Sequence, residues 1–290
     1  MFGSIILLSL FVYPQTIATF PFQIETEPIK LNGSVTKTAS CHRNASKSIL
    51  ITPSFPMSGS GWIQNILYSS LTAAGVKDFH QEGTPHFGFN RFSIGENKFE
   101  WLFTHESNDE VWINEAFPKI EFVDRPLIMF RVVRSVLYNV ESFYRYSSRE
   151  QQKNAPDSEP IDFNSFSFKT IDSYREFHTY YTTKCLPRSD DSIQLLSSGA
   201  FSESGEFPTQ MCCIDVTYED LQDSFFVREL LRKLLALWLG EFLTENDIWL
   251  GVERVTRLLK PLHVPHGQYA SGERFTPAHL LQLATLEADI

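Results

Sequence analysis

Four consecutive small residues, Ser58, Gly59, Ser60 and Gly61, form the stretch of this sequence best suited to binding an anion. Small side chains let backbone N–H groups converge on a phosphate or sulfonate, and the start of a helix adds a favourable dipole. The same run also suits an ordinary turn in which serines cap a helix. The sequence therefore supports two interpretations of this loop, an anion cradle and a plain strand-to-helix turn.

His105 is a candidate general base, because it directly follows the apolar run from 99 to 104. Open α/β sheets place reactive groups at the carboxyl ends of their strands, and a histidine there is suited to take a proton from a substrate hydroxyl. The alternative is a histidine that only forms a hydrogen bond at the end of a strand.

Arg134 and Ser142 are a candidate pair for binding a phosphate. Arg134 ends the β-branched, apolar run from 126 to 133, and Ser142 lies eight residues later. That spacing is just over two helical turns, so a ligand near the strand end could contact both side chains. Arginine offers a fixed fork of donors and serine adds a hydroxyl. A surface arginine and an unrelated helix serine are the other interpretation.

Strands and helices alternate along the chain and must position these residues. Apolar runs predict strands over 48–52, 99–105, 126–133 and 211–217. Apolar residues at helical spacing predict helices over 62–75, 136–144, 227–240 and 249–259. The acidic pair Glu219 and Asp220 favours an N-terminal helix cap over a catalytic dyad.

Two stretches are predicted to be less regular. From 76 to 100, glycines and a proline interrupt any long element, which predicts loop with short strands. The polar stretch 147–210 contains one amphipathic helix and is expected to form a lid or substrate wall. Its aromatic residues suit stacking on sugar rings or packing of the helix onto the core; they are Tyr174, Phe177, Tyr180 and Tyr181.

Composition predicts a folded protein that binds any anion through local groups. The 290 residues are 42% hydrophobic and 14% aromatic, which is enough for a sizeable core. A net charge of −10 and a pI near 5.3 argue against a broad nucleic-acid or anionic-membrane surface. We therefore expect no nucleic-acid partner.

The N-terminus resembles a secretory signal. Ile5–Tyr13 is almost wholly apolar, and Thr16–Ala18 offers a small-x-small cleavage pattern. The run is shorter than the ~20 residues needed to span a bilayer. We therefore expect residues 1–18 to be a signal peptide or a short anchor remnant, and 19–46 to be a lumenal segment. A buried strand or a piece of a longer anchor is the alternative, so membrane association is expected only with an uncleaved anchor.

Sequons and cysteines are consistent with a lumenal chain. Sequons stand at Asn32 and Asn44, which predicts a glycoprotein. The four cysteines are Cys41, Cys185, Cys212 and Cys213. A disulfide from Cys41 or Cys185 to the adjacent pair and buried free thiols are both possible. No metal-ligand spacing is present, so no metal is expected.

From about residue 47 to the C-terminus the chain resembles one family, the sulfotransferases that use 3′-phosphoadenosine 5′-phosphosulfate (PAPS). Phe55–Trp62 is similar to the family loop Tyr/Phe-Pro-Lys-Ser-Gly-Thr-Thr-Trp, and Thr104-His105 to its Lys-Thr-His. Further matches, in the family's order, are Arg134 with Ser142, the Tyr-Glu-Asp-Leu at 218–221 and the Phe-Thr-Pro at 275–277.

The resemblance implies a role for each matching residue. His105 is the expected catalytic base. Residues expected to bind the nucleotide are Ser58, Gly59, Ser60, Gly61, Trp62, Arg134, Ser142 and Tyr218. The implied fold is α/β, a single domain over 47–290 with a mainly parallel central sheet flanked by helices and a P-loop-like strand-loop-helix nucleotide site.

The chain departs from the family pattern at three places. Met57 replaces the loop lysine that neutralises the leaving oxygen, and Gly61 replaces the second loop threonine. His266-Gly267 stands where the family has Arg-Lys-Gly. Ser58, Ser60 or Arg131 would then have to supply part of the missing stabilisation.

The expected function is transfer of a sulfuryl group from PAPS to an acceptor hydroxyl on a carbohydrate, in the lumen of the secretory pathway, either in the Golgi or after secretion. The alternative is an impaired relative that binds the nucleotide without turnover. A P-loop kinase is disfavoured because the loop lacks the Gly-Lys-Ser/Thr ending that binds phosphates and Mg²⁺.

Overall fold

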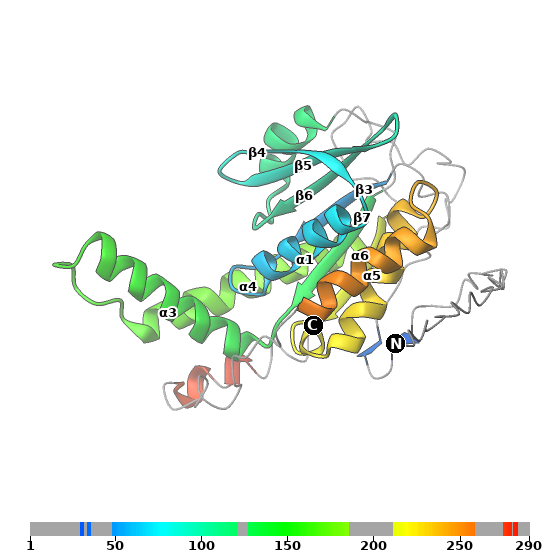
Figure 1. Cartoon of the computed structure of the whole chain (residues 1–290). Coiled ribbons are helices and arrows are strands. Elements are labelled where there is room, and N and C mark those ends of the chain that lie inside the picture. The colour runs from blue at the N-terminus through cyan, green and yellow to red at the C-terminus, as the bar shows by residue number, and fades with distance from the viewer. Residues whose placement is uncertain are drawn as a thin grey trace, which may run out of the picture.

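A six-stranded sheet with the order β4-β5-β6-β3-β7-β8 forms the centre of the molecule (Figure 1). Its strands are β3 (Ile49–Pro53), β4 (Lys77–Gly83), β5 (Phe87–Ile94), β6 (Asn97–Thr104), β7 (Leu127–Val133) and β8 (Met211–Thr217). The neighbours β6, β3, β7 and β8 pair in parallel, whereas β4 and β5 are antiparallel additions at one edge. The sheet is therefore mostly parallel, as the sequence predicts.

The computed structural model describes residues 30–31, 34–35, 48–120, 127–185, 211–258, 275–279 and 281–283. A two-residue pair, β1 (Lys30–Leu31) and β2 (Ser34–Val35), lies outside the main sheet. The predictions that fall outside the described residues concern the signal peptide, both sequons, Cys41, 186–210 and His266-Gly267.

Helices cover both faces of the sheet. The α-helices are α1 (Ser60–Ala73), α2 (Asp109–Val111), α3 (Val136–Asn154), α4 (Phe163–Cys185), α5 (Ser224–Leu239) and α6 (Glu245–Leu258). Shorter turns are the π-helix η1 (Trp112–Ala116) and the 3-10 helices η2 (Phe117–Lys119) and η3 (Asp220–Gln222). In the described ranges, no helix has the length and apolar character needed to cross a bilayer.

The alternating side chains of the central strands build two cores. Leu50 of β3 faces a core shared with α1, α5 and α6, whereas Ile49 and Ile51 face a second core shared with α3 and α4. A strand buried on both faces explains why β3 and β7 read as continuous apolar runs. The chain is thus a single α/β domain with a helical layer on each side of the sheet (Figure 1).

The prediction of irregular structure over 76–100 is wrong. The region forms the antiparallel meander of β4, β5 and β6, with strands of seven and eight residues. Position 88 in β5 requires glycine, because a Cβ there would come within 1.8 Å of the Phe103 ring. Gly95, with a φ of +60°, forms the turn between β5 and β6. These glycines permit the sheet instead of interrupting it.

The prediction for 147–210 is also partly wrong, because α3 extends to Asn154 and α4 is 23 residues long. The face of α4 that carries Tyr174, Phe177 and Tyr181 is buried in the second core, with exposures of 2% or less. These three aromatics pack the helix onto the sheet and are not available to stack on a sugar. Glu219 and Asp220 do lie at the start of a helix, the short η3, but Glu219 forms no side-chain cap bond there. The longer helix α5 is capped by Asp223, which accepts from two backbone amides.

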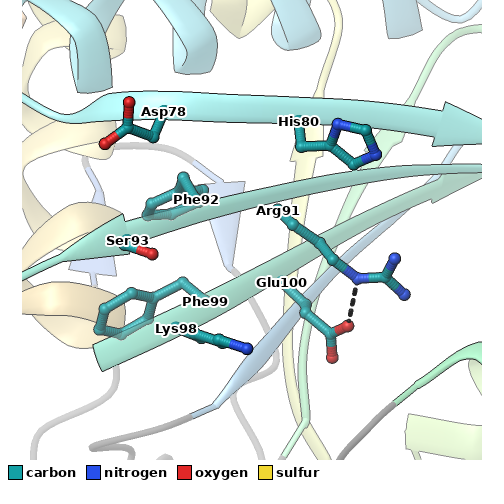
Figure 2. A pocket seen from close by; sticks show the side chains of 8 residues that line it. All are labelled: Asp78, His80, Arg91, Phe92, Ser93, Lys98, Phe99 and Glu100. Carbon is teal, nitrogen blue, oxygen red and sulfur yellow. Dashed lines mark hydrogen bonds and ion pairs between the residues drawn. The ribbon is translucent and has the colours of Figure 1, made fainter. Parts of the chain in front are cut away.

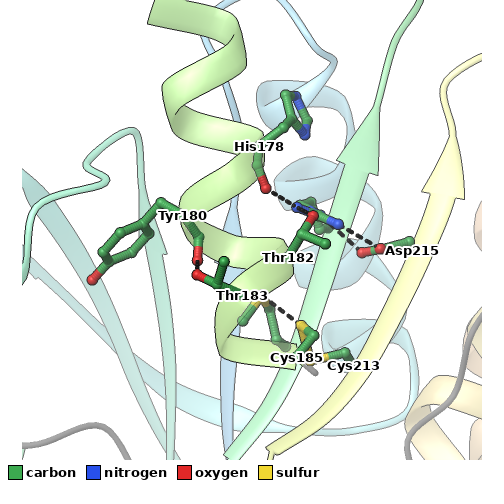
Figure 3. Close-up of a disulfide and its surroundings, with 9 residues drawn as sticks. His178, Tyr180, Thr182, Thr183, Cys185, Cys213 and Asp215 are labelled. Carbon is green, nitrogen blue, oxygen red and sulfur yellow. Dashed lines mark hydrogen bonds and ion pairs between the residues drawn. A yellow bond between two sulfur atoms is a disulfide. The ribbon is translucent and has the colours of Figure 1, made fainter. Parts of the chain in front are cut away.

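A disulfide and a partly buried ion pair hold α4 against β7 and β8 (Figure 3). Cys185, the last residue of α4, is bonded to Cys213 of β8, and Cys212 is also disulfide-bonded. Nearby, Arg131 of β7 donates two hydrogen bonds to Asp215, of 2.9 and 2.6 Å, and one to the carbonyl of His178. Of the two alternatives that the sequence leaves open, the structure thus shows a disulfide for Cys185 and not a free thiol.

Candidate functional site

The candidate residues gather where the four parallel strands end. Ser54, His105, Arg134 and Tyr218 directly follow β3, β6, β7 and β8. The strands β6 and β7 lie on opposite sides of β3, so the chain order reverses there. Ligands of open α/β sheets bind at such a reversal, outside the carboxyl ends of the strands.

The loop from β3 to α1 is sharply turned. The Ser58 amide donates to the Phe55 carbonyl at 3.0 Å, and Met57 and Gly59 adopt left-handed φ values of 65° and 96°. Gly59 is the N-cap of α1, without a side-chain cap. The first amides of a helix have no partner inside it, so Ser60 and Gly61 direct unsatisfied donors from the end of α1.

Two predicted binding residues in this loop have internal partners. Ser58 is fully buried, and its hydroxyl accepts a hydrogen bond of 2.8 Å from Asn139. Trp62 packs against the first core and donates its amide to the Gly59 carbonyl at 3.1 Å. These residues shape the loop, whereas Gly59, Ser60 and Gly61 form its outer turn.

Arg134 and Ser142, predicted as a pair, are brought together at the loop. One Nη of Arg134 donates to the Ser142 hydroxyl at 3.1 Å and to the Met57 carbonyl at 2.8 Å. The Arg134 carbonyl accepts a hydrogen bond of 2.6 Å from Tyr174. Its Nε is buried and has no acceptor among the described residues. A buried cationic donor without an acceptor is costly, so this guanidinium suits an anionic ligand.

Tyr218 lies between the arginine and the loop. Its ring centroid is 4.6 Å from the Arg134 guanidinium carbon, and its amide donates to the Val133 carbonyl at 2.7 Å. A Cβ on Gly59 would lie 2.7 Å from the same ring. Gly59 therefore allows the aromatic ring to approach the loop closely.

Asn139 belongs to the site although sequence reasoning missed it. It is fully buried, and its amide group donates to the Pro56 carbonyl at 2.9 Å as well as to Ser58. These bonds fix the loop against α3. The available signal was its place three residues before Ser142 on a predicted helix, which puts both side chains on one face.

His105 is exposed and has a defined tautomer. Its Nδ1 lies within hydrogen-bonding distance of the Ser54 carbonyl. A carbonyl can only accept, so Nδ1 carries the proton and Nε2 keeps its lone pair. Since Ser54 also donates its amide to Thr104 at 3.0 Å, the extended pairing of β3 with β6 holds the ring in place. The geometry is that of a base whose accepting atom is Nε2.

A cavity of about 380 Å³ opens beside His105. It is lined by residues 81–88 and 103–105. His86 in its wall contacts Glu106 through Nδ1 at 2.8 Å and Glu115 through Nε2 at 3.3 Å. The hydrogen bond to Glu106 and the charges of both carboxylates raise the pKa of His86, with burial opposing them. This cluster was missed because His86 lies within the stretch predicted to be loop, whereas both carboxylates come from segments after it.

A smaller cavity of about 190 Å³ lies on β4, β5 and β6, near the opposite end of β6 from His105 (Figure 2). Arg91 and Glu100 in its wall are paired at 2.9 Å. Arg91 also forms an ion pair with Glu82. This cavity contains none of the residues grouped around the β3–α1 loop.

Arg131, one of three residues that the sequence offers to compensate for Met57, does not turn toward the site. Its side chain is 4% exposed and is paired with Asp215. Of the two arginines near the end of β7, the described structure brings Arg134 to the loop and leaves Arg131 in the ion pair beneath α4. The cation expected to compensate for Met57 is therefore used elsewhere.

Ser167 and His279 form a buried pair that resembles part of a hydrolase triad, but the imidazole proton is on the nitrogen that faces the serine. The Thr276 amide donates to Nδ1 of His279 at 3.1 Å, so Nε2 carries the proton and donates to Ser167 at 2.7 Å. The Ser167 hydroxyl in turn donates to the Asn164 carbonyl. Because the histidine cannot accept the serine proton, the pair anchors the C-terminal segment in which Phe275 is buried.

Chemically, the site combines helix-end amides, one arginine fork and an exposed imidazole with a free Nε2. No family model matches the chain, and no curated protein matches it. The function must therefore be inferred from this geometry together with the motifs.

Proposed function

We propose that the chain is a PAPS-dependent sulfotransferase that transfers a sulfuryl group to a hydroxyl of a carbohydrate acceptor. One observation carries the proposal: several candidate groups gather at the carboxyl ends of the parallel strands. They are the β3–α1 loop, Arg134 with Ser142, Tyr218 and His105. Four chain segments far apart in sequence contribute one group each. That arrangement is what a nucleotide site at the reversal of strand order requires.

The nucleotide would be held by two groups of donors. The amides of Gly59, Ser60 and Gly61, at the positive end of α1, suit the 5′-phosphosulfate. Arg134 and Ser142 suit the 3′-phosphate, and the orphaned Nε of Arg134 supports an anion there. Tyr218 would lie near the adenine, as its counterpart does in the family. When bound, PAPS supplies an activated sulfuryl group on a good leaving group.

Protein groups contribute positioning and proton transfer to the reaction. Nε2 of His105 would accept the proton of the acceptor hydroxyl while that oxygen attacks sulfur. Charge that develops on the leaving phosphate would be stabilised by the helix-end amides, since preorganised donors cost no reorganisation during reaction. This division resembles phosphoryl transfer, in which positioning and electrostatics dominate.

A carbohydrate acceptor in the secretory lumen is supported by two features. The cavity beside His105 is lined by polar side chains as well as Phe87 and Phe103, which suits a sugar ring. The disulfide between Cys185 and Cys213 supports an oxidising compartment, because such bonds persist there. We accordingly propose the Golgi lumen or the extracellular space as the site of action.

The nucleotide grip is tested by calorimetry on Arg134→Ala. We expect affinity for 3′-phosphoadenosine 5′-phosphate to fall by about one to two decades, since a charge-assisted contact is worth roughly 1.5–3 kcal/mol. Affinity for the analogue without the 3′-phosphate should change little. Arg149→Ala, an exposed arginine on the same helix α3, is the control. Equal losses for both nucleotides would make Arg134 structural and remove the basis for the proposal.

Catalysis is tested by incubating the chain with labelled donor and a panel of glycans. We expect transfer by wild type and by His80→Ala, which changes an exposed histidine of β4, and loss of about 10²–10⁴-fold in His105→Ala. Transfer by His105→Ala at the wild-type rate would show that this histidine is not the base.

A second function, nucleotide binding without turnover, is favoured by one observation. Met57 takes the place of the family lysine, and Arg131, the nearby arginine of β7, is paired with Asp215. In the part of the chain that the structure describes, neither residue therefore supplies the cation expected at the leaving oxygen. Nucleotide binding without transfer, together with transfer gained in Met57→Lys, would establish this alternative.

A further inference from the structure

His86 in the wall of the cavity beside His105 belongs to a second charged cluster, whose other members, Glu106 and Glu115, contact its ring from outside the lining. Glu82 in the wall adds a further carboxylate. The inference drawn from this cluster rests on the proposed function, because it concerns the compound whose hydroxyl would meet Nε2 of His105. The question is which chemistry the cavity admits.

His86 is fixed in the cavity wall by backbone as well as side-chain contacts. Its amide donates to the Thr84 hydroxyl at 3.2 Å, and its carbonyl accepts from the Thr104 hydroxyl at 2.9 Å. The imidazole lies between Glu106 and Glu115 at 2.8 and 3.3 Å. Since both ring nitrogens face carboxylates, the ring cannot readily turn to donate to an anionic ligand.

The element that supplies Glu115 is also anchored. Glu115 lies on the π-helix η1, whose Trp112 is fully buried and packs edge-on against Phe87 with centroids 4.6 Å apart. Single π-turns often occur at functional sites. The carboxylate is therefore presented by a packed element and not by a loose loop.

Among the described residues, carboxylates outnumber cations in the cluster around His86. The charges that shift the pKa of His86 are those of Glu106 and Glu115, and both raise it. Even when His86 is protonated, one cation faces two carboxylates. Glu82 is paired with Arg91, but Arg91 also binds Glu100. Arg91 thus faces two carboxylates, and Lys119 lies nearby, with its Nζ 5.9 Å from the Phe89 ring centroid.

We propose that this cavity binds the acceptor and selects it by charge, admitting neutral or amine-bearing sugars and rejecting carboxylated or sulfated ones, with the His86–Glu106–Glu115 cluster as the determinant. The side chains of His86, Glu106 and Glu115 are 37%, 30% and 31% exposed. Solvent screens groups with this exposure, so the discrimination is moderate and depends on ionic strength.

The test uses ligand-observed NMR on the full chain, without turnover. Three methyl glycosides of the same ring size are compared: a glucoside, a 2-amino-2-deoxyglucoside and a glucuronide. We expect the glucoside and the amino sugar to bind, and the glucuronide to bind roughly tenfold more weakly at low salt. The difference should narrow at high salt, because screening weakens the repulsion.

Matched variants separate the cluster from the general negative charge of the protein. Glu106→Gln combined with Glu115→Gln should raise glucuronide binding severalfold and leave the glucoside unchanged, and Glu115→Gln alone should give a smaller effect in the same direction. Glu110→Gln, an exposed residue between them in sequence, is the control and should change nothing.

Equal binding of glucoside and glucuronide by wild type, no binding of any glycoside, or an equal effect of the Glu110 control would each overturn the inference. The proposed function is judged separately, by the Arg134 calorimetry. If the nucleotide result holds and the glycoside result fails, the acceptor assignment alone is wrong. If nucleotide binding fails, the sulfotransferase proposal is wrong whatever the glycosides do.

Discussion

Replacing Gly59 by alanine tests the packing at the centre of the candidate site. Gly59 has a φ of +96°, and an added Cβ would lie 2.7 and 2.8 Å from two ring carbons of Tyr218. The ring has little room to move, because it is 7% exposed and stacks on the Arg134 guanidinium. The substitution therefore creates both backbone strain and a steric clash.

The backbone strain and the steric clash contribute separately to the loss of stability. A side chain in the left-handed region costs about 1–2 kcal/mol. Forcing an extra carbon against a packed ring costs about 1–3 kcal/mol more, so Gly59→Ala should lower the free energy of unfolding by about 2–5 kcal/mol. Gly75 has nearly the same φ, +92°, but no atom within 4 Å of its Cβ position. Gly75→Ala should therefore lower the free energy of unfolding only by the cost of the backbone strain.

Urea denaturation of both variants measures the difference directly. The decisive comparison is Gly59→Ala made in a Tyr218→Ala background, where the ring is absent and the cost should fall to that of Gly75→Ala. Equal costs in the two backgrounds would refute the claim that Gly59 is required by Tyr218. In the wild-type background, nucleotide affinity should fall along with stability, since the displaced ring lies against Arg134.

Two further predictions concern α4. Burial, with the charge of Arg131, lowers the pKa of His178 from 6.5 to about 3. Between these two pH values the unfolded chain binds a proton at His178 that the folded chain does not. The contribution of this group to the free energy of unfolding is therefore full above pH 6.5 and declines as the pH falls toward 3. Wild type should lose about 2–3 kcal/mol from this group between pH 7 and 4.5, and His178→Phe should not; a loss in His178→Phe as large as in the control His80→Gln would contradict this. Cys185→Ser with Cys213→Ser opens a link spanning 28 residues and should lower the free energy of unfolding by about 3–4 kcal/mol. An unchanged urea midpoint would show that the link does not stabilise the fold.

Much of the central sheet was predictable because its strands are buried on both faces. Such strands read as continuous apolar runs, and β3 and β7 lie within about a residue of their predicted ranges. The edge strand β8 is half-buried at several positions, but it also matches its predicted range. The position of His105 and Arg134 follows from the same reasoning, since each ends a predicted strand. Parallel pairing then brings strand ends together, which is why the Arg134–Ser142 pair and the loop meet.

The meander was not predictable from the same signals, because its glycines have a packing role that sequence does not reveal. Gly88 reads as a strand breaker until Phe103 is placed opposite it. The acidic cluster at His86 was missed with it, since its members come from the β4–β5 connection, η1 and the segment after β6. Contacts between distant segments, unlike periodicity within one segment, leave little trace in a single sequence.

The two arginines at the end of β7 show how strand pairing decides which side chain can reach a ligand. Arg131 lies within the ladder, directly opposite Asp215 of β8, so the two side chains share a face and form a cross-strand ion pair. Arg134 comes after the last paired residue, where the backbone leaves the sheet, and its side chain reaches the β3–α1 loop. From the sequence, both arginines are candidates for binding a phosphate, but the pairing register places Arg131 opposite Asp215 and so excludes it. With Arg134 assigned to the 3′-phosphate, the leaving 5′-phosphate would be stabilised by the amides at the end of α1, and a lysine in place of Met57 would add positive charge there.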